Sequence, residues 1–301
     1  MEQKLSEARE LIKEGNLGKA LEIYQEAHRK DPGNLAVMRY LASIHTKRGD
    51  LDLADEILEK LTAQRSDSQD YVSLAQNSLK RKQWDRAAMY AREALQAAIQ
   101  GNGYSAEARA IMGDSAFRSG DLAKAADHYT TVLSVNPLHL RALTGRGTVS
   151  LSLKEYDSAL EFFERALSVN PHHARAILGK GLVFLSLGRK HEAASLIEES
   201  LLLEPDNAWA IATLLPLLTE DRKFEQADDV LKHYLEHFPD DYPLMLAKAG
   251  IAFKLGRLME CRKLLDQVLD AHPEYPGAQE LDRELKIMVS RMNHSREAVS
   301  A

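Results

Sequence analysis

The stretch that decides the fold runs from Leu140 to Pro171 and reads LRALTGRGTVSLSLKEYDSALEFFERALSVNP. The same pattern returns, altered, along almost the whole chain. Its ruler is a set of prolines at intervals of 34 residues: Pro137, Pro171, Pro205, Pro239 and Pro273. A fixed period of this length is typical of a repeat array, in which each repeat is one supersecondary unit packed against its neighbours.

Each period contains two segments whose apolar residues have helical spacing. In the quoted stretch, the first segment carries Leu140, Leu143, Gly147 and Leu151, and the second carries Ala159, Leu160, Phe163 and Leu167. The small residues Gly147 and Ala159 allow two helices to approach closely. Pro171 ends the second helix because the residue before a proline is disfavoured in the α region. One such helical hairpin cannot bury its apolar face alone, so it needs neighbours.

The pattern resembles the tetratricopeptide repeat, a 34-residue helix-turn-helix unit. That family has a small residue at position 8, alanine near 20 and 27, a bulky residue at 24 and proline at 32. The matching residues here are Gly147, Ala159, Phe163, Ala166 and Pro171. About eight such repeats cover residues 1–275. The resemblance implies an all-α, right-handed superhelical solenoid with a C-terminal capping helix.

The period divides the chain into segments. Repeats 1 to 3 occupy residues 1–97 and repeats 4 to 8 occupy residues 106–275, with an irregular joint at 98–105 around Gly101-Asn102-Gly103. This turn signal is also compatible with a slightly longer loop. A capping helix is expected at 276–292, followed by a flexible tail at 293–301. Pro216 lies inside the first helix of repeat 7, where proline predicts a kink or a helix split in two.

Composition narrows the function and the compartment. The chain has 301 residues, a net charge of −6 and one cysteine, Cys261. The acidic balance disfavours nucleic-acid binding, which is typical of a basic face. One cysteine precludes an internal disulfide. The N-terminal residues lack the apolar core of a secretory signal, and no run is long enough for a membrane span. We therefore expect a cytoplasmic protein.

No catalytic constellation emerges from the motifs, so the sequence predicts neither an enzyme nor a cofactor. The segment around Gly179 and Gly181 lacks the flanking residues of a P-loop, and Gly113 starts a nucleophile elbow without its second glycine. His233 and His237 share a helix face but have no third metal ligand nearby. Cys261 stands where four other repeats have alanine, which indicates a small core residue.

The family resemblance also suggests where a partner would bind. In tetratricopeptide arrays the first helices line a concave groove, with positions 2, 5, 9 and 12 facing into it. The candidate partner-binding residues are therefore Arg141, Thr144, Thr148, Arg175, Leu178, Leu182 and Trp209. Helices packed 8–10 Å apart would let Arg141 and Arg175 address two carboxylates of one acidic segment. The alternative is that these arginines pair with acids of their own array, such as Glu107 or Asp114.

These observations favour a non-enzymatic scaffold or adaptor that holds a protein or peptide partner, within a larger assembly. A self-associating structural protein, a homo-oligomer, is the alternative. RNA binding, known for a related helical-repeat family, is disfavoured by the 34-residue period and the acidic balance. The family's carboxylate clamp for chaperone C-termini needs lysine and asparagine at positions where this chain has Leu5, Arg9, Ala110 and Asp114.

Overall fold

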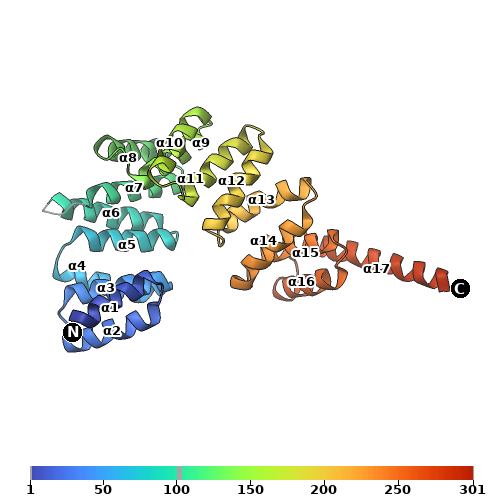
Figure 1. Cartoon of the computed structure of the whole chain (residues 1–301), viewed down its shortest axis with the longest axis horizontal. Helices are drawn as coiled ribbons and strands as arrows, with labels where there is room; N and C mark the ends of the chain where they lie inside the picture. Colours follow the sequence, from blue (N-terminus) through green and yellow to red (C-terminus); the bar gives the residue numbers. More distant parts are fainter. Residues whose placement is uncertain (1, 100–103, 301) are drawn as a thin grey trace. The chain divides into compact units, whose positions relative to one another are not determined.

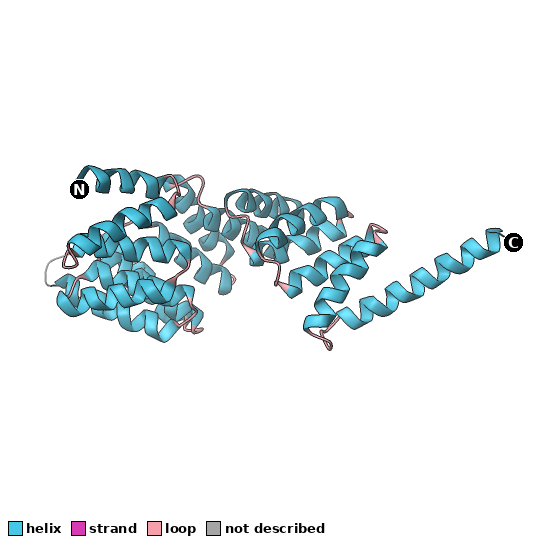
Figure 2. Cartoon of the chain, turned by 90° about the horizontal axis from the view of Figure 1, so that it is seen from below, coloured by secondary structure: helices cyan, strands magenta, loops and turns pink. Residues whose placement is uncertain are grey.

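The computed structural model is helical throughout the residues that it describes, 2–99 and 104–300, excepting the side chains of residues 99 and 292–300 (Figures 1 and 2). No strand occurs in these two ranges. The predicted all-α helical-repeat fold is thus confirmed. The helices are α1 (Glu2–Lys13), α2 (Leu17–Lys30), α3 (Leu35–Arg48), α4 (Leu51–Gln64), α5 (Ser68–Lys80), α6 (Trp84–Ile99), α7 (Ser105–Arg118), α8 (Leu122–Val135), α9 (Leu140–Ser152), α10 (Tyr156–Val169), α11 (Ala174–Ser186), α12 (Lys190–Leu203), α13 (Ala208–Glu220), α14 (Phe224–His237), α15 (Tyr242–Lys254), α16 (Leu258–Ala271) and α17 (Ala278–Ser300).

Each repeat is a pair of helices held together by a small residue facing a bulky one. A Cβ atom added to Gly147 of α9 would lie 2.9 Å from Cε1 of Phe163 in α10, so only glycine allows this approach. Gly113 of α7 faces Tyr129 of α8 in the same way, at 2.6 Å. Phe163 and Tyr129 are almost fully buried. The repeat positions seen in the sequence therefore mark the contacts within each helix pair.

The turn inside each repeat contains one residue with a left-handed backbone. Glycine occupies this place in five repeats, at Gly15, Gly49, Gly120, Gly188 and Gly256. Lysine or arginine occupies it in the other three, with φ of 59° at Lys82, 62° at Lys154 and 58° at Arg222. Because side chains with a Cβ are disfavoured in this region, these three turns are strained.

The turn between repeats supplies the N-cap of the next first helix. The side chain of Asn207 accepts a hydrogen bond from the amide of Ala210, at 3.1 Å, and Asp241 caps α15 similarly. His139 and His173 act as caps through Nδ1, which accepts from the amides of Ala142 and Ala176 at 3.3 Å. These caps satisfy amides that a helix start leaves without partners.

The chain divides into two compact units. The N-terminal unit, Met1–Val169, contains α1 to α10, and the C-terminal unit, Asn170–Ala301, contains α11 to α17. In the C-terminal unit, one apolar cluster joins α11 through α15, and a second joins α15, α16 and the start of α17. Cys261 belongs to the second cluster and is fully buried, and burial raises the pKa of its thiol to about 11. Its assignment as a core residue is confirmed.

The structure bears in different ways on three local predictions: the joint at 98–105, the effect of Pro216 and the end of the capping helix. The predicted joint at 98–105 lies partly outside the described residues, since 100–103 are not among them. Of the two outcomes expected at Pro216, a kink or a split, the split is wrong, because α13 is one helix from Ala208 to Glu220. The capping helix was expected to end at 292, but α17 continues to Ser300 because neither glycine nor proline interrupts it. Its start packs on α15 and α16, where Ala278 and Leu285 are buried (Figure 1).

Candidate partner-binding face

We define the first-helix face as positions 2, 5, 9 and 12 of the first helix of each repeat, the positions predicted to meet a partner. In the N-terminal unit, polar side chains on and beside this face bond to the neighbouring repeat. Arg39 of α3 donates to both carboxylate oxygens of Asp70, at 2.7 and 2.8 Å, and to Asp67 at 2.7 Å. Both acids are buried. This arginine is therefore engaged within the array.

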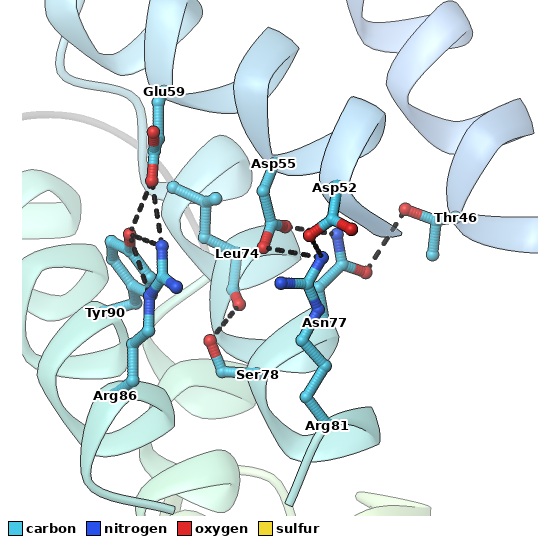
Figure 3. A network of polar contacts seen from close by, with 10 residues as sticks. All are labelled: Thr46, Asp52, Asp55, Glu59, Leu74, Asn77, Ser78, Arg81, Arg86 and Tyr90. Atoms are coloured by element: carbon cyan, nitrogen blue, oxygen red, sulfur yellow. Dashed lines mark hydrogen bonds and ion pairs between the residues drawn. The ribbon is translucent and has the colours of Figure 1, made fainter. Parts of the chain in front are cut away.

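A second set of polar contacts links three successive helices, α3, α4 and α5 (Figure 3). Thr46 donates to the side-chain oxygen of Asn77, at 3.2 Å, and the amide of Asn77 donates to Asp55 at 2.8 Å. Arg81 lies 2.9 Å from Asp52 and 3.5 Å from Asp55. Asn77 is fully buried, so this network fixes the repeats to one another.

Arg141, a predicted binding residue, is also held by its own array. Its guanidinium lies 2.9 Å from Glu107 and 2.5 Å from Asp114, both on α7. Burial alone would lower the pKa of Arg141, but the two carboxylates outweigh this effect and raise it. Asp114 also accepts the hydroxyl hydrogen bond of Tyr129, at 2.6 Å. The internal pairing that the sequence left open is thus confirmed for Arg141.

The other predicted residues of α9 are occupied as well. Thr144 is buried, and its hydroxyl donates to the carbonyl of Leu140 at 2.9 Å. The hydroxyl of Thr148 donates to the carbonyl of Thr144 at 2.8 Å. A Cβ on Gly145 would lie 2.3 Å from Cζ of Tyr129, so the tyrosine ring fills the space above α9. The first-helix face of the N-terminal unit is therefore largely satisfied from within.

The C-terminal unit differs. Arg175 of α11 is exposed and has no hydrogen bond or ion pair to any described residue. Leu178 is buried in the apolar cluster, and Leu182 is half-buried against it. Trp209, at the start of α13, is 59% exposed, a large value for an indole. Of the predicted residues, Arg175 and Trp209 are those that a partner could reach directly.

Helices α13 and α15 extend this accessible surface, and α15 ends at the exposed Lys254. Ala212 and Pro216 are exposed on α13, whose one ionisable side chain, Glu220, is its last residue. On α15, Pro243 is exposed and Gly250 half-buried. The sequence prediction did not include Pro243 or Gly250. The signal was available, since they are positions 2 and 9 of repeat 8, one period after Trp209 and Pro216.

Histidine, cysteine and acidic side chains are candidate metal ligands. No group of three histidine, cysteine or acidic side chains there could hold a metal ion. The ring of His237 contacts the carbonyl of His233 at 3.0 Å, which is contact within one helix. Among the helices described, none combines the length and apolar character needed to cross a bilayer.

Comparison with known proteins places the chain in a family. Family models described as "Tetratricopeptide repeat" match residues 11–77, 150–215 and 218–284, and a further model of that description matches 112–168. No curated protein matches the sequence.

Among solved structures, one match is the Cut9–Hcn1 hetero-tetramer of the APC/C, at a TM-score of 0.66 and 17% identity. It covers 94% of this chain and 55% of that one, so the chain spans about half the length of this relative. Another is PilF of Pseudomonas aeruginosa, at a TM-score of 0.57 and 20% identity, covering 72% of this chain and 97% of that one. At such identities the likeness shows the fold alone. Because the family models match well over half of its residues, the chain belongs to the tetratricopeptide repeat family.

Proposed function

We propose that this protein is a non-enzymatic interaction scaffold that holds a segment of a partner protein on the first-helix face of its C-terminal unit, within a larger assembly. The observation that carries the proposal is Trp209, 59% exposed on a helix whose accessible face has no charge before Glu220. Tryptophan and arginine are the residue types most enriched at binding hot spots. Burying the Trp209 indole against a partner would remove a large apolar area from water.

Arg175 supports the same surface. It occupies the repeat position of Trp209 one period earlier and has no acid of its own among the described residues. An exposed guanidinium without an internal partner can bind a carboxylate in two-point geometry. We therefore keep the prediction of an acidic group in the partner segment, now centred on Arg175. Arg141 keeps a structural role in this proposal. A cytoplasmic location remains a prediction from the sequence.

The test is capture of partners from the source cells by wild-type protein and by an Arg175→Glu/Trp209→Ala double variant. A Leu202→Ala variant is the control, because Leu202 is 85% exposed on the second helix α12 of the same unit. Circular dichroism checks that all three proteins are equally folded. Partners lost only with the double variant support the proposal. Capture that is equal for all three proteins contradicts it.

Self-association is the second candidate, and α17 favours it. Beyond the part of α17 that packs on α15 and α16, its middle exposes three consecutive apolar residues, Ile287, Met288 and Val289, at 53, 40 and 39%. Exposed apolar surface of this kind is typical of an interface. Sedimentation at increasing protein concentration distinguishes the two candidates. A homo-oligomer is supported if the measured mass of the wild type rises with concentration and the Ile287→Glu variant keeps the mass of a monomer.

A further inference from the structure

The helical glycines of this protein fall into two groups. Gly113, Gly145 and Gly147 sit beneath aromatic rings, so that an added Cβ would overlap Tyr129 or Phe163. An added Cβ on Gly181 would lie 3.2 Å from Leu196. Gly250, in the interior of α15, is different, because its added Cβ would meet no atom within 4 Å and its φ is not left-handed; Gly18, in the first turn of α2, is open in the same way. Neither packing nor backbone geometry requires glycine there, although glycine weakens a helix interior.

Pro216 presents the same situation one repeat earlier. It occupies position 9 of α13, and Gly250 occupies position 9 of α15. Proline lacks the amide hydrogen that a residue at this place in α13 would donate, and its side chain is exposed. Two consecutive first helices thus carry the two poorest helix formers at one register, on the accessible side. At these two positions no long side chain projects from the helix, so the main chain of another molecule could approach the helix closely.

The surroundings of this surface define what would fit. Trp209 and Pro243 are exposed at the N-terminal ends of the two helices, and Phe253 is half-buried toward the end of α15. Lys248, inside α15, is buried and paired with Asp228. The exposed charges of the two helices, Glu220 and Lys254, are their last residues, so the surface between Trp209 and Pro216 and between Pro243 and Gly250 carries none. A charged segment laid over that part would lose hydration without gaining a partner, whereas an apolar one would gain from burial.

Arg175 adds one polar requirement. It stands at position 2 of α11, the repeat position held by Trp209 in α13, and it has no acid among the described residues. We propose that the surface around Pro216 and Gly250 binds an apolar, cation-free segment of a partner protein, whose one carboxylate pairs with Arg175. This proposal rests on the function proposed above and specifies the chemistry of the partner.

The test uses phage-displayed random peptides of 12 residues, selected on the wild-type protein. Enriched peptides are synthesised with a fluorophore, and their dissociation constants are measured by anisotropy. We expect several large apolar residues and one aspartate or glutamate, without lysine or arginine. Selection of basic peptides, or failure to enrich any peptide, would overturn the proposal.

Gly250→Leu provides the decisive variant, because its Cβ enters open space, and circular dichroism checks that the variant is folded like the wild type. We expect the dissociation constant to rise at least 10-fold for Gly250→Leu. Gly18→Leu is the control, since Gly18 is also helical and open at Cβ; its dissociation constant should equal that of the wild type. Gly250→Ala should raise Tm by about 2 °C while weakening binding. Unchanged binding by Gly250→Leu refutes the proposal.

Two further results separate this proposal from the general one. Arg175→Glu should lose at least 10-fold in affinity, and a peptide whose acid is replaced by lysine should recover most of that loss. If partner capture from cells depends on Trp209 but tolerates Gly250→Leu, the scaffold function stands and the proposed partner chemistry is wrong. If instead Gly250→Leu abolishes a concentration-dependent increase in mass, the occupant is a second copy of this chain, which also contradicts the proposal.

Discussion

Nε of Arg141 lies 2.9 Å from the carboxylate of Glu107, a residue that holds the same repeat position one period earlier. Asp114 lies about two helical turns further along the same helix. Its carboxylate contacts Nη1 of the same guanidinium. Removing the arginine would leave Asp114 with the hydroxyl of Tyr129, and Glu107 with Gln76 and His139. Arginine at position 2 therefore has different roles in successive repeats. Arg141 pairs with acids of its own array, whereas Arg175 pairs with no acid among the described residues.

Arg141→Met should accordingly destabilise the protein by about 2–3 kcal/mol, because it leaves charge-assisted hydrogen bonds unmade in a partly buried site. Arg175→Met should change stability by less than about 0.5 kcal/mol, as expected for an exposed residue without a partner. Urea unfolding followed by circular dichroism measures both. Equal losses for the two variants would show that the pairing of Arg141 contributes nothing to folding.

The turns offer a matched test of backbone strain. Arg222 has φ of 58°, and Gly256 has φ of 73° at the same position of the next repeat. Because a left-handed residue with a Cβ costs about 1 kcal/mol or more, Arg222→Gly should stabilise the protein by about 1 kcal/mol. Gly256→Ala should destabilise it by a similar amount, since its Cβ would enter open space and only φ is affected. Urea midpoints that shift the same way for both variants would contradict this account.

Gly145 and Gly250 should respond oppositely to alanine. The Cβ of Gly145→Ala would lie 2.3 Å from the Tyr129 ring, which other packing holds in place, so this variant should lose about 2–3 kcal/mol. Gly250→Ala should gain about 0.5–1 kcal/mol from helix propensity, because nothing opposes the added methyl group. Thermal unfolding of the two variants beside the wild type checks the contrast. A loss for Gly250→Ala would indicate hidden crowding there.

The sequence predicted the helix pairs well because their determinants are local and recur. The small residue at Gly147, the bulky one at Phe163 and the terminating proline each act within a single repeat. The role of Arg141 could not be read from one repeat, since it depends on the position 2 and position 9 residues of the repeat before. Repeat 4 supplies Glu107 and Asp114 there.

The continuity of α13 and the open space at Gly250 were not predicted, because general rules for proline and glycine do not take the surrounding residues into account. Proline usually breaks a helix, but α13 continues through Pro216, since Ile211, Leu214, Leu215 and Leu218 around it are buried in one cluster. Burial of these side chains outweighs the lost hydrogen bond. Gly250 was overlooked because glycine is common at repeat positions that need close packing. Gly250 differs from Gly147 in that an added Cβ would meet open space at Gly250 and the ring of Phe163 at Gly147.

A pH dependence follows from His173, the N-cap of α11. Burial, together with the charge of Arg175, lowers the pKa of His173 below its usual 6.5. The folded state therefore prefers the neutral ring, whose Nδ1 accepts the amide of Ala176. Above pH 6.5 both states are neutral and the cap is intact. As the pH falls below 6.5 the unfolded state takes up the proton first, so stability declines toward the lowered pKa.

The expected result is a lower Tm at pH 5.5 than at pH 7.5, with a smaller difference in His173→Asn, since asparagine caps a helix at either pH. His128, whose pKa burial also lowers, should account for part of the remaining slope. A pH profile of His173→Asn that matches the wild type would show that the cap does not titrate in this range.

The ammonium group of Lys248 is buried in the C-terminal unit. It pairs with Asp228 and lies 3.3 Å from Glu260, while Asp228 also accepts from Arg257 at 2.6 Å. Burial alone would raise the pKa of Asp228, but the hydrogen bonds and charges of Lys248 and Arg257 together outweigh it and lower the pKa.

Lys248→Met should destabilise the protein by about 2–3 kcal/mol, because it leaves part of a buried carboxylate unpaired. The Lys248→Met/Asp228→Leu double variant should lose less than the sum of the single losses, since the unpaired charge is removed with its partner. A urea double-mutant cycle measures this coupling. If the two single losses in the free energy of unfolding simply add up in the double variant, Lys248 and Asp228 are not coupled. The packing of α15 would then stabilise this repeat without a contribution from the ion pair.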